Sequence, residues 1–113
     1  MRTDARLPAH LEVAAIRRIA ESQGGFAAVL GKGDPDSGVI AVVIICRDEP
    51  AMLMERMPNA RGNRRFIPTL VQDIDSPAEF SAILSRRRDR DPDSWLIEVD
   101  VPDKERFVAA LPG

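Results

Sequence analysis

One run of eight apolar residues, VIAVVIIC at positions 39–46, constrains the fold more than any other part of the chain. Most of these residues are Val or Ile, which favour strands. Because consecutive side chains of a strand point to opposite faces of a sheet, a strand without polar residues has to be covered on both faces. The run therefore predicts a central strand in a sheet that carries other elements on both sides.

The other elements are placed by their start and stop signals. Pro8 suits the first turn of a helix and Gly24-Gly25 suits its end, which predicts a helix over 8–23. Further strands are expected over 26–30, 51–57, 64–72 and 95–101, a second helix over 77–89, and a short last helix after Pro102-Asp103.

Two local signals refine these elements. Ser76 followed by Glu79, with Pro77 between them, predicts a capping box at the start of the second helix. Pro68 lies within the fourth predicted strand and cannot donate a hydrogen bond to a neighbour. It therefore places that strand at an edge of the sheet or at a bulge.

The predicted element order is α-β-β-β-β-α-β-α, in a single domain over 1–113 whose residues 1–6 form a flexible tail. Hairpin-length loops join the first four strands, which predicts that they form an antiparallel meander. The helix before the fifth strand leaves the position of that strand open. The expected fold class is α+β, with a mainly antiparallel sheet of four or five strands and helices packed on it.

Charge and cysteine content narrow the functional classes. The net charge of −2 argues against a dedicated nucleic-acid-binding protein. The single cysteine, Cys46, cannot form an internal disulfide and lies in the apolar run, so we expect a buried thiol in a reducing compartment. No apolar run approaches the ~20 residues that span a membrane, and the first residues lack the apolar core of a signal peptide. We therefore expect a cytoplasmic protein without membrane contact.

The tetrapeptide Asp-Pro-Asp-Ser occurs twice, at 34–37 and at 91–94. The first copy joins two predicted strands and the second joins a helix to a strand, so their surroundings do not support an internal repeat. Asp before Pro favours an extended or turn conformation, and Asp and Ser side chains bond to nearby backbone groups. DPDSG lacks the closing Glu of an EF-hand loop. Both copies are therefore predicted to be surface turns that hold no metal in common.

Two charged residues fall on predicted apolar helix faces. Arg87 continues the apolar stripe of the second helix, whereas Arg86 and Arg88 are expected to point away. Arg87 either reaches water past the helix end, binds a ligand, or pairs with a carboxylate. Its candidate partners are Glu98, Asp91 and Asp93, with stacking on Trp95 as a further alternative. Glu12 either projects past the sheet or is a half-buried acid that needs a cation.

Glu98 and Asp100 share one face of the predicted fifth strand, about 7 Å apart. Two carboxylates at this spacing suit acid/base chemistry or a metal, and they equally suit a solvated outer face. His10 is the only histidine, the chain has no tyrosine, and no GxSxG motif occurs. We therefore favour a non-catalytic protein without a cofactor or bound metal, and keep a metal-assisted enzyme as an alternative.

Basic residues gather in segments that suit a phosphate-bearing ligand. Lys32 lies beside Asp34 in a glycine-rich loop, although the spacing differs from that of a P-loop. Arg64 and Arg65 could combine with the run RRRDR at 86–90 into a patch that binds phosphate, a nucleotide or RNA. Ordinary solvated loops and helix ends explain the same residues.

Three segments resemble a known family when they are taken together. They are LPAHLEVAAIRR at 7–18, GGFAAVLGKGDPDSG at 24–38 and DPDSWLIEVD at 91–100. The chain resembles, over residues 7–107, a bacterial family of short proteins known only as domain of unknown function number fourteen ninety-one. Gly31 departs from this pattern, because a larger polar residue is expected before Lys32. The resemblance implies a cytosolic protein of this size and supplies no activity, ligand or catalytic residue.

These observations favour a binding or accessory module that acts through protein contacts. We also expect a homodimer, because Met and Leu side chains lie on both faces of the third predicted strand and few helices are available to cover them. These side chains belong to Met52, Leu53, Met54 and Met57. The candidate ligand-binding residues are Lys32, Asp34, Arg64, Arg65, Arg87, Trp95 and Glu98.

Overall fold

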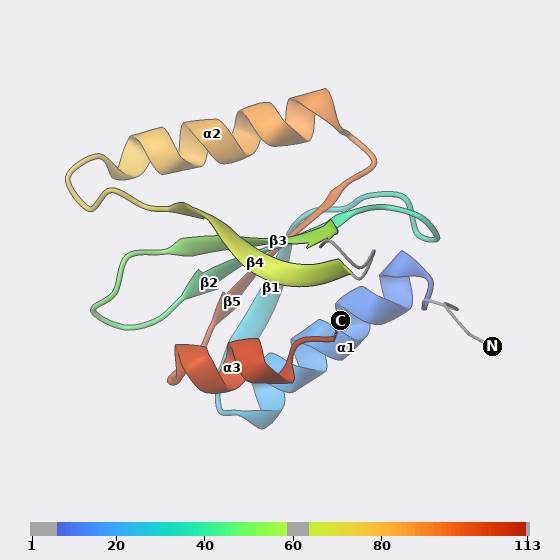
Figure 1. Ribbon diagram of the computed structural model, residues 1–113, viewed down its shortest axis with the longest axis horizontal. Coiled ribbons are helices and arrows are strands. Elements are labelled where there is room, and N and C mark those ends of the chain that lie inside the picture. The colour runs from blue at the N-terminus through green and yellow to red at the C-terminus, as the bar shows by residue number, and fades with distance from the viewer. Residues whose placement is uncertain (1–6, 59–63, 113) are drawn as a thin grey trace.

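A computed structural model describes residues 7–58 and 64–112 of the protein. Within them the chain forms the predicted order of helices and strands (Figure 1). The elements are α1 (Ala9–Ser22), β1 (Phe26–Gly31), β2 (Ile40–Ile45), β3 (Met52–Pro58), β4 (Arg64–Val71), α2 (Pro77–Arg90), β5 (Trp95–Asp100) and α3 (Lys104–Ala110). The residues 1–6 that were predicted to form a tail lie outside the described part of the chain.

The five strands form one mixed sheet in the order β1-β5-β2-β3-β4. Strand β5 lies between β1 and β2, antiparallel to β1 and parallel to β2, while β2, β3 and β4 form an antiparallel meander. The α+β class is confirmed, but the prediction that the first four strands form a meander is wrong. The loop between β1 and β2 is long enough to cross the width of one strand. After β4, helix α2 returns the chain across the sheet, so that β5 occupies the position between β1 and β2.

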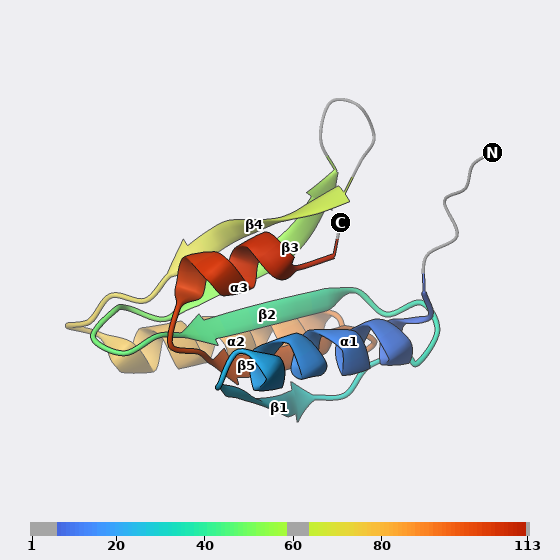
Figure 2. The ribbon, with the colours of Figure 1, turned by 90° about the horizontal axis from the view of Figure 1, so that it is seen from below.

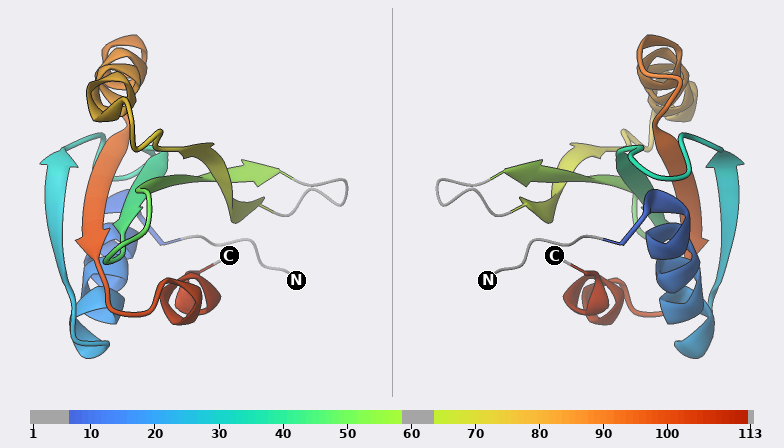
Figure 3. Two further views of the ribbon diagram at one scale, coloured as in Figure 1. Left: turned by 90° about the vertical axis from the view of Figure 1, so that its left-hand side faces the viewer. Right: turned by 90° about the vertical axis from the view of Figure 1, so that its right-hand side faces the viewer.

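The helices lie on both faces of the sheet. Helices α1 and α3 cover one face and α2 lies over the other (Figures 1 and 3). The larger core cluster lies between the sheet, α1 and α3, and it includes Ile16, Val42, Ile44, Ile97 and Phe107. A smaller cluster lies beneath α2 and consists of Val43, Ala51, Leu53, Phe80 and Leu96. Strand β2 therefore contributes to both clusters, as its uninterrupted apolar sequence predicts.

Strand β3 does not need a second chain to cover it. Leu53 and Met54 are buried on opposite faces of the sheet within one copy, and Met52 packs half-buried against the larger cluster. The side chain of Met57 lies outside the described residues. The placement of apolar side chains on both faces of this strand is confirmed, but the expectation that one copy cannot cover them is wrong. The homodimer itself stays a prediction.

Strand β4 is the second edge of the sheet, as Pro68 predicts. Its pairing with β3 shifts register where Leu53 faces Leu70 and Met54 faces Pro68, so the strand is also bulged at this point. Both predicted consequences of Pro68 occur together because a residue without a backbone N–H cannot continue a regular ladder.

Helix α2 begins at Pro77 as predicted, but the expected capping box is not formed. The Ser76 side chain makes no capping hydrogen bond. The backbone N–H of Ser76, which Glu79 would have to reach, donates instead to the carbonyl oxygen of Asp73 at 2.9 Å. The turn at Asp73 therefore replaces the capping box.

The two Asp-Pro-Asp-Ser segments are surface turns, as predicted, and they lie against each other. The backbone N–H of Asp34 donates to the carbonyl oxygen of Asp93 at 2.9 Å. In the first segment the Asp34 carboxylate accepts the N–H groups of Asp36 and Ser37, each at 2.9 Å. In the second segment the hydroxyl of Ser94 donates to the carbonyl oxygen of Asp91 at 2.7 Å. The same tetrapeptide sequence thus forms two turns with different hydrogen bonds.

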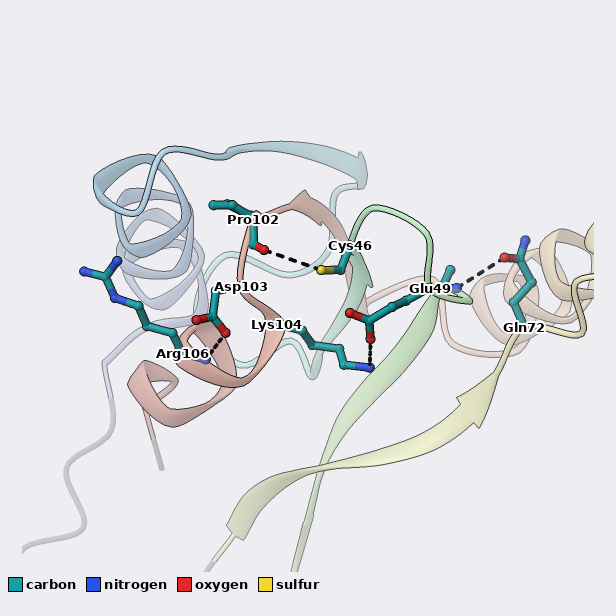
Figure 4. A network of polar contacts seen from close by, with 8 residues as sticks. Cys46, Glu49, Gln72, Pro102, Asp103, Lys104 and Arg106 are labelled. Carbon is teal, nitrogen blue, oxygen red and sulfur yellow. Dashed lines mark hydrogen bonds and ion pairs between the residues drawn. The ribbon is translucent and has the colours of Figure 1, made fainter.

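Polar contacts connect α3 to the end of β2 (Figure 4). Lys104 pairs with Glu49 at 2.7 Å, and this contact raises the pKa of Lys104 and lowers that of Glu49. The thiol of Cys46 is buried, as predicted, with its Sγ 3.8 Å from the carbonyl oxygen of Pro102. These contacts join the turn after β2 to the start of α3.

No helix formed by residues 7–58 and 64–112 has the length and apolar character needed to cross a membrane.

Candidate functional site

The candidate site is a groove between α2 and the sheet, with a volume of about 450 Å³. Helix α2 rests on the sheet through Phe80 and Leu84, which pack against the smaller core cluster. The groove lies on the side of α2 that faces β1. Its apolar part includes Val43 and Leu96, with Leu30 of β1 also lining it. Figure 3 shows α2 standing above the sheet.

Glu98 supplies a carboxylate to this groove. In the sheet register Glu98 lies between Ala28 of β1 and Val43 of β2, and Val43 in turn faces Leu53 of β3. The side chain of Glu98 is half-buried. Among the described residues no cation pairs with it. Within the described part of the chain, the groove thus places a carboxylate without an ion-pair partner beside an apolar surface.

Arg88 lines the same groove but binds elsewhere. Its guanidinium donates to the carbonyl oxygen of Ser94 and, at 3.5 Å, to that of Lys32. The prediction that Arg88 points away is therefore wrong. An arginine in the last turn of α2 can reach the loop carbonyls because β5 begins only a few residues later and β1 ends beside it.

The opposite end of the groove is held by Gln72 and Ala51. The side-chain oxygen of Gln72 (Figure 4) accepts the backbone N–H of Ala51 at 3.2 Å. The backbone N–H of Gln72 donates to the carbonyl oxygen of Ala51 at 2.8 Å. The chain leaving β4 is therefore fixed to the start of β3, so this end of the groove has a defined shape.

Arg87 forms an ion pair with Glu55 of β3. The expected partners Asp91, Asp93 and Glu98, and stacking on Trp95, are therefore wrong. Thr69 of β4 also donates to Glu55, at 2.6 Å. Glu55 faces Ala41 and Ala41 faces Leu96, so one row across three strands lies beneath the end of α2. The helical stripe identified Arg87 from the sequence, but its partner depends on the strand order.

Trp95 lies on the other face of the sheet from Glu98. It is buried in the larger core cluster, and its indole N–H donates to the carbonyl oxygen of Asp34 at 2.7 Å. The structure thus joins two of the predicted site residues, Trp95 and Asp34, through the turn that both support. It separates them from Glu98 by the thickness of the sheet.

The remaining predicted basic residues lie at the surface or outside the described part of the chain. Lys32 and Arg65 are exposed. The side chain of Arg64 and residues 59–63 lie outside the description, so an arginine patch there stays a prediction. Asp100 lies on the same face of β5 as Glu98, as predicted, and is exposed. Within the described residues, His, Cys, Asp and Glu form no cluster of three or more that suits a metal ion.

A second cavity of about 370 Å³ lies at the start of α1, lined by Glu12 and Arg56. These two side chains pair with each other, so the acid is buried rather than projecting past the sheet. The first N–H groups of α1 are also occupied, because those of Ala9 and His10 donate to carbonyl oxygens of the first Asp-Pro-Asp-Ser turn. Sequence reasoning identified Glu12 but missed Arg56. A signal for Arg56 is present in the sequence, because Met52, Met54 and Arg56 are spaced two residues apart and therefore share one face of β3.

The comparisons with known proteins agree with this fold. The family described as "Protein of unknown function (DUF1491)" matches residues 7–109. The chain belongs to the DUF1491 family. The predicted family resemblance is therefore confirmed, and the description of DUF1491 carries no activity or ligand. No curated protein matches the chain.

Solved structures of similar proteins support the same conclusion. The crystal structure of a DUF1491 family protein from Caulobacter crescentus CB15 is 28% identical, with a TM-score of 0.79 over 95% of this chain and 98% of that one. A solution structure of a protein from A. tumefaciens is 29% identical, with a TM-score of 0.74 over 96% and 98% of the two chains. An NMR structure of a DUF1491 family protein from C. crescentus CB15 is also 29% identical, with a TM-score of 0.76 over 94% of each chain.

Proposed function

We propose that this DUF1491 protein is a non-catalytic binding module, which takes a segment of a partner protein into the groove beneath α2. The segment places an apolar side chain against Val43 and Leu96 and a Lys or Arg beside Glu98. We expect the protein to act in the cytoplasm.

The observation that carries this proposal is that Glu98 is half-buried and has no ion-pair partner among the described residues. A carboxylate that is partly removed from water is unfavourable unless a cation or hydrogen-bond donors compensate for the lost hydration. Within the described residues Glu98 has no ion-pair partner, and its neighbours Ala28 and Val43 in the sheet are apolar. A peptide with adjacent apolar and basic residues satisfies both parts of this surface.

The limited packing of α2 on the sheet, which leaves a groove on each side of the helix, supports the same proposal. Only Phe80 is buried on this helix, and Leu84 is half-buried beside it. A second groove of about 210 Å³ lies on the other flank, where Arg87 and Glu55 form their ion pair. On this flank Arg87 and Glu55 are paired within the chain, whereas on the other flank Glu98 offers its charge to a partner.

The alternative functions from the sequence are phosphate or RNA recognition by arginines and metal-assisted catalysis by Glu98 and Asp100. Both stay predictions. The protein-binding proposal is favoured over the first because Arg87 and Arg88 already bind groups of this chain. It is favoured over the second because Asp100 does not line the groove that contains Glu98.

A peptide selection tests the proposal. A library of random peptides displayed on phage is selected against the immobilised full-length protein, and enriched peptides are titrated into ¹⁵N-labelled protein. We expect enriched sequences with Lys or Arg next to large apolar residues, and amide shifts at Val43, Leu96 and Glu98. Replacing Glu98→Gln should weaken the binding of such a peptide by roughly 10- to 100-fold, because it removes a charge-assisted contact.

Asp100→Asn is the matched control, since it neutralises the next carboxylate on the same face of β5 outside the groove. It should leave the affinity within about twofold, well under the tenfold change that corresponds to 1.4 kcal/mol. Enriched peptides without basic residues, equal affinity of Glu98→Gln and wild type, or shifts confined to another surface would each reject the proposal.

A further inference from the structure

Strand β1 leaves one edge of the sheet free. Among residues 7–58 and 64–112 it pairs only with β5, and it lies at the end of the strand order. Figure 2 shows β1 at the outside of the molecule, below α1, with no further element beyond it. The strand contains no charged residue and no proline. Phe26 is 66% exposed and Leu30 is 52% exposed, so the free edge is also apolar.

The other edge strand, β4, differs in charge, proline content and regularity. Strand β4 begins with Arg64 and Arg65, contains Pro68, and is bulged beside that proline. Charges, proline and bulges are the features by which edge strands avoid pairing with other chains. Strand β1 has one irregularity, between Val29 and Gly31 at its end, and Phe26–Val29 pairs regularly.

We propose that β1 pairs antiparallel with β1 of a second copy of this chain, about a twofold axis at Ala28. An isologous contact needs a surface that is complementary to itself. In this register Phe26 faces Leu30 of the second copy, and Ala27 faces Val29 of the second copy. Both of these cross-strand pairs therefore join two apolar side chains. At the axis Ala28 faces Ala28 of the second copy, where two small side chains fit.

The charges beyond the ends of β1 are complementary under the same symmetry. Lys32 follows the strand, Glu21 precedes it in the last turn of α1, and both side chains are exposed. In the antiparallel arrangement the end of β1 that carries Lys32 lies beside the start of β1 in the second copy, which follows Glu21 closely in sequence. The twofold axis repeats this attraction at both ends, whereas a parallel pairing would bring like charges together.

The size of the contact predicts a weak dimer. The exposed parts of Phe26, Val29 and Leu30 amount to a few hundred Å² per copy, on the order of half of a standard interface of ~800 Å² per partner. We therefore expect association in the micromolar range rather than an obligate dimer. The partner copy would also place its Phe26 beside Leu30, which lines the groove beneath α2. The dimer itself requires no ligand, so it can be tested separately from the proposed function.

Sedimentation equilibrium from 1 µM to about 1 mM tests the dimer, a range that brackets the affinities of weak interfaces. We expect the mass of the wild type to rise from 12.5 kDa towards twice that value. Ala28→Lys should stay monomeric, because the twofold axis places two like charges directly opposite each other. Val71→Lys, which adds the same charge to an exposed position of the other edge strand, should dimerise like the wild type.

A charge-swap experiment checks the register and guards against misfolding. Ala28→Lys and Ala28→Glu should each be monomeric alone and should form a mixed dimer when combined, since opposite charges then meet at the axis. A wild type that stays monomeric up to 1 mM, an Ala28→Lys variant that dimerises as the wild type does, or a mixture that remains monomeric would each overturn the proposal.

Discussion

Arg56 of β3 and Glu12 of α1 form an ion pair beneath the helix, with only 11% and 10% of their side chains exposed. Arg56 also donates to the carbonyl oxygen of Pro112 at 3.1 Å, and its guanidinium lies 4.6 Å from the centre of the Phe66 ring. One largely buried arginine therefore connects the first helix, two strands and the residues after α3.

Replacing Glu12→Gln should lower the free energy of unfolding by about 3–5 kcal/mol, because Arg56 then keeps a buried charge without its partner. Urea unfolding followed by circular dichroism measures this loss. The double variant Glu12→Leu/Arg56→Met should be closer to the wild type than Glu12→Gln, since it replaces both charges by apolar groups. A loss below 1 kcal/mol for Glu12→Gln would show that the pair contributes no more than a surface contact does.

Arg87→Met should lower the free energy of unfolding by about 1 kcal/mol or less. The pair with Glu55 is more open than that of Arg56, with 40% of the Arg87 side chain and 23% of the Glu55 side chain exposed. Water therefore screens the attraction. Arg86→Met, at an exposed position of the same helix, serves as the control in the same urea experiment. A loss of several kcal/mol for Arg87→Met would contradict this expectation.

Asp34 should make the stability of the fold depend on pH in acid. The backbone N–H groups of Ser37 and Asp36 lower the pKa of Asp34 below its usual value of 3.8. Because the folded pKa is lower than the unfolded one, this stabilisation is present above pH 3.8 and is lost as the pH falls through the folded pKa.

Asp34→Ala should therefore be less stable than the wild type at neutral pH, and the difference should shrink as the solution is acidified. Thermal unfolding of both proteins between pH 7 and pH 2 measures this change, a range that covers the ordinary and lowered values for Asp. Asp36→Ala, an exposed neighbour in the same turn, is the control. A difference between Asp34→Ala and the wild type that stays constant across this range would contradict the role of the carboxylate.

Cys46 should react slowly with a thiol reagent in the folded protein. Burial raises the pKa of its thiol, so the reactive thiolate is scarce, and the surrounding core excludes the reagent. Its reaction with Ellman's reagent should accelerate in urea at the concentration that unfolds the protein. A cysteine introduced by Val71→Cys, at a position that is exposed in the wild type, should react at once. Rapid modification of native Cys46 would show that the end of β2 opens readily.

Sequence patterns predict most of the local structure, because local structure depends on residues that are near neighbours in the chain. The run at 39–46 predicts a strand covered on both faces, and Val42 and Val43 do contribute to opposite core clusters. Proline and glycine signals locate both long helices to within a residue or two. The alternation of WLIEVD correctly assigns Trp95 to the core and Glu98 to the opposite face.

Which segments contact each other depends on long-range packing, which local sequence patterns do not encode. The place of β5 between β1 and β2 follows from the packing of α2 across the sheet, and a loop length does not encode it. The partners of Glu12 and Arg87 are therefore Arg56 and Glu55, which are distant in sequence, and no helical periodicity could name them. The candidate groove has the same origin, because Glu98 becomes a neighbour of Val43 only once a parallel strand pair has formed. Sequence patterns determine the direction in which a side chain points, whereas long-range packing determines what it meets there.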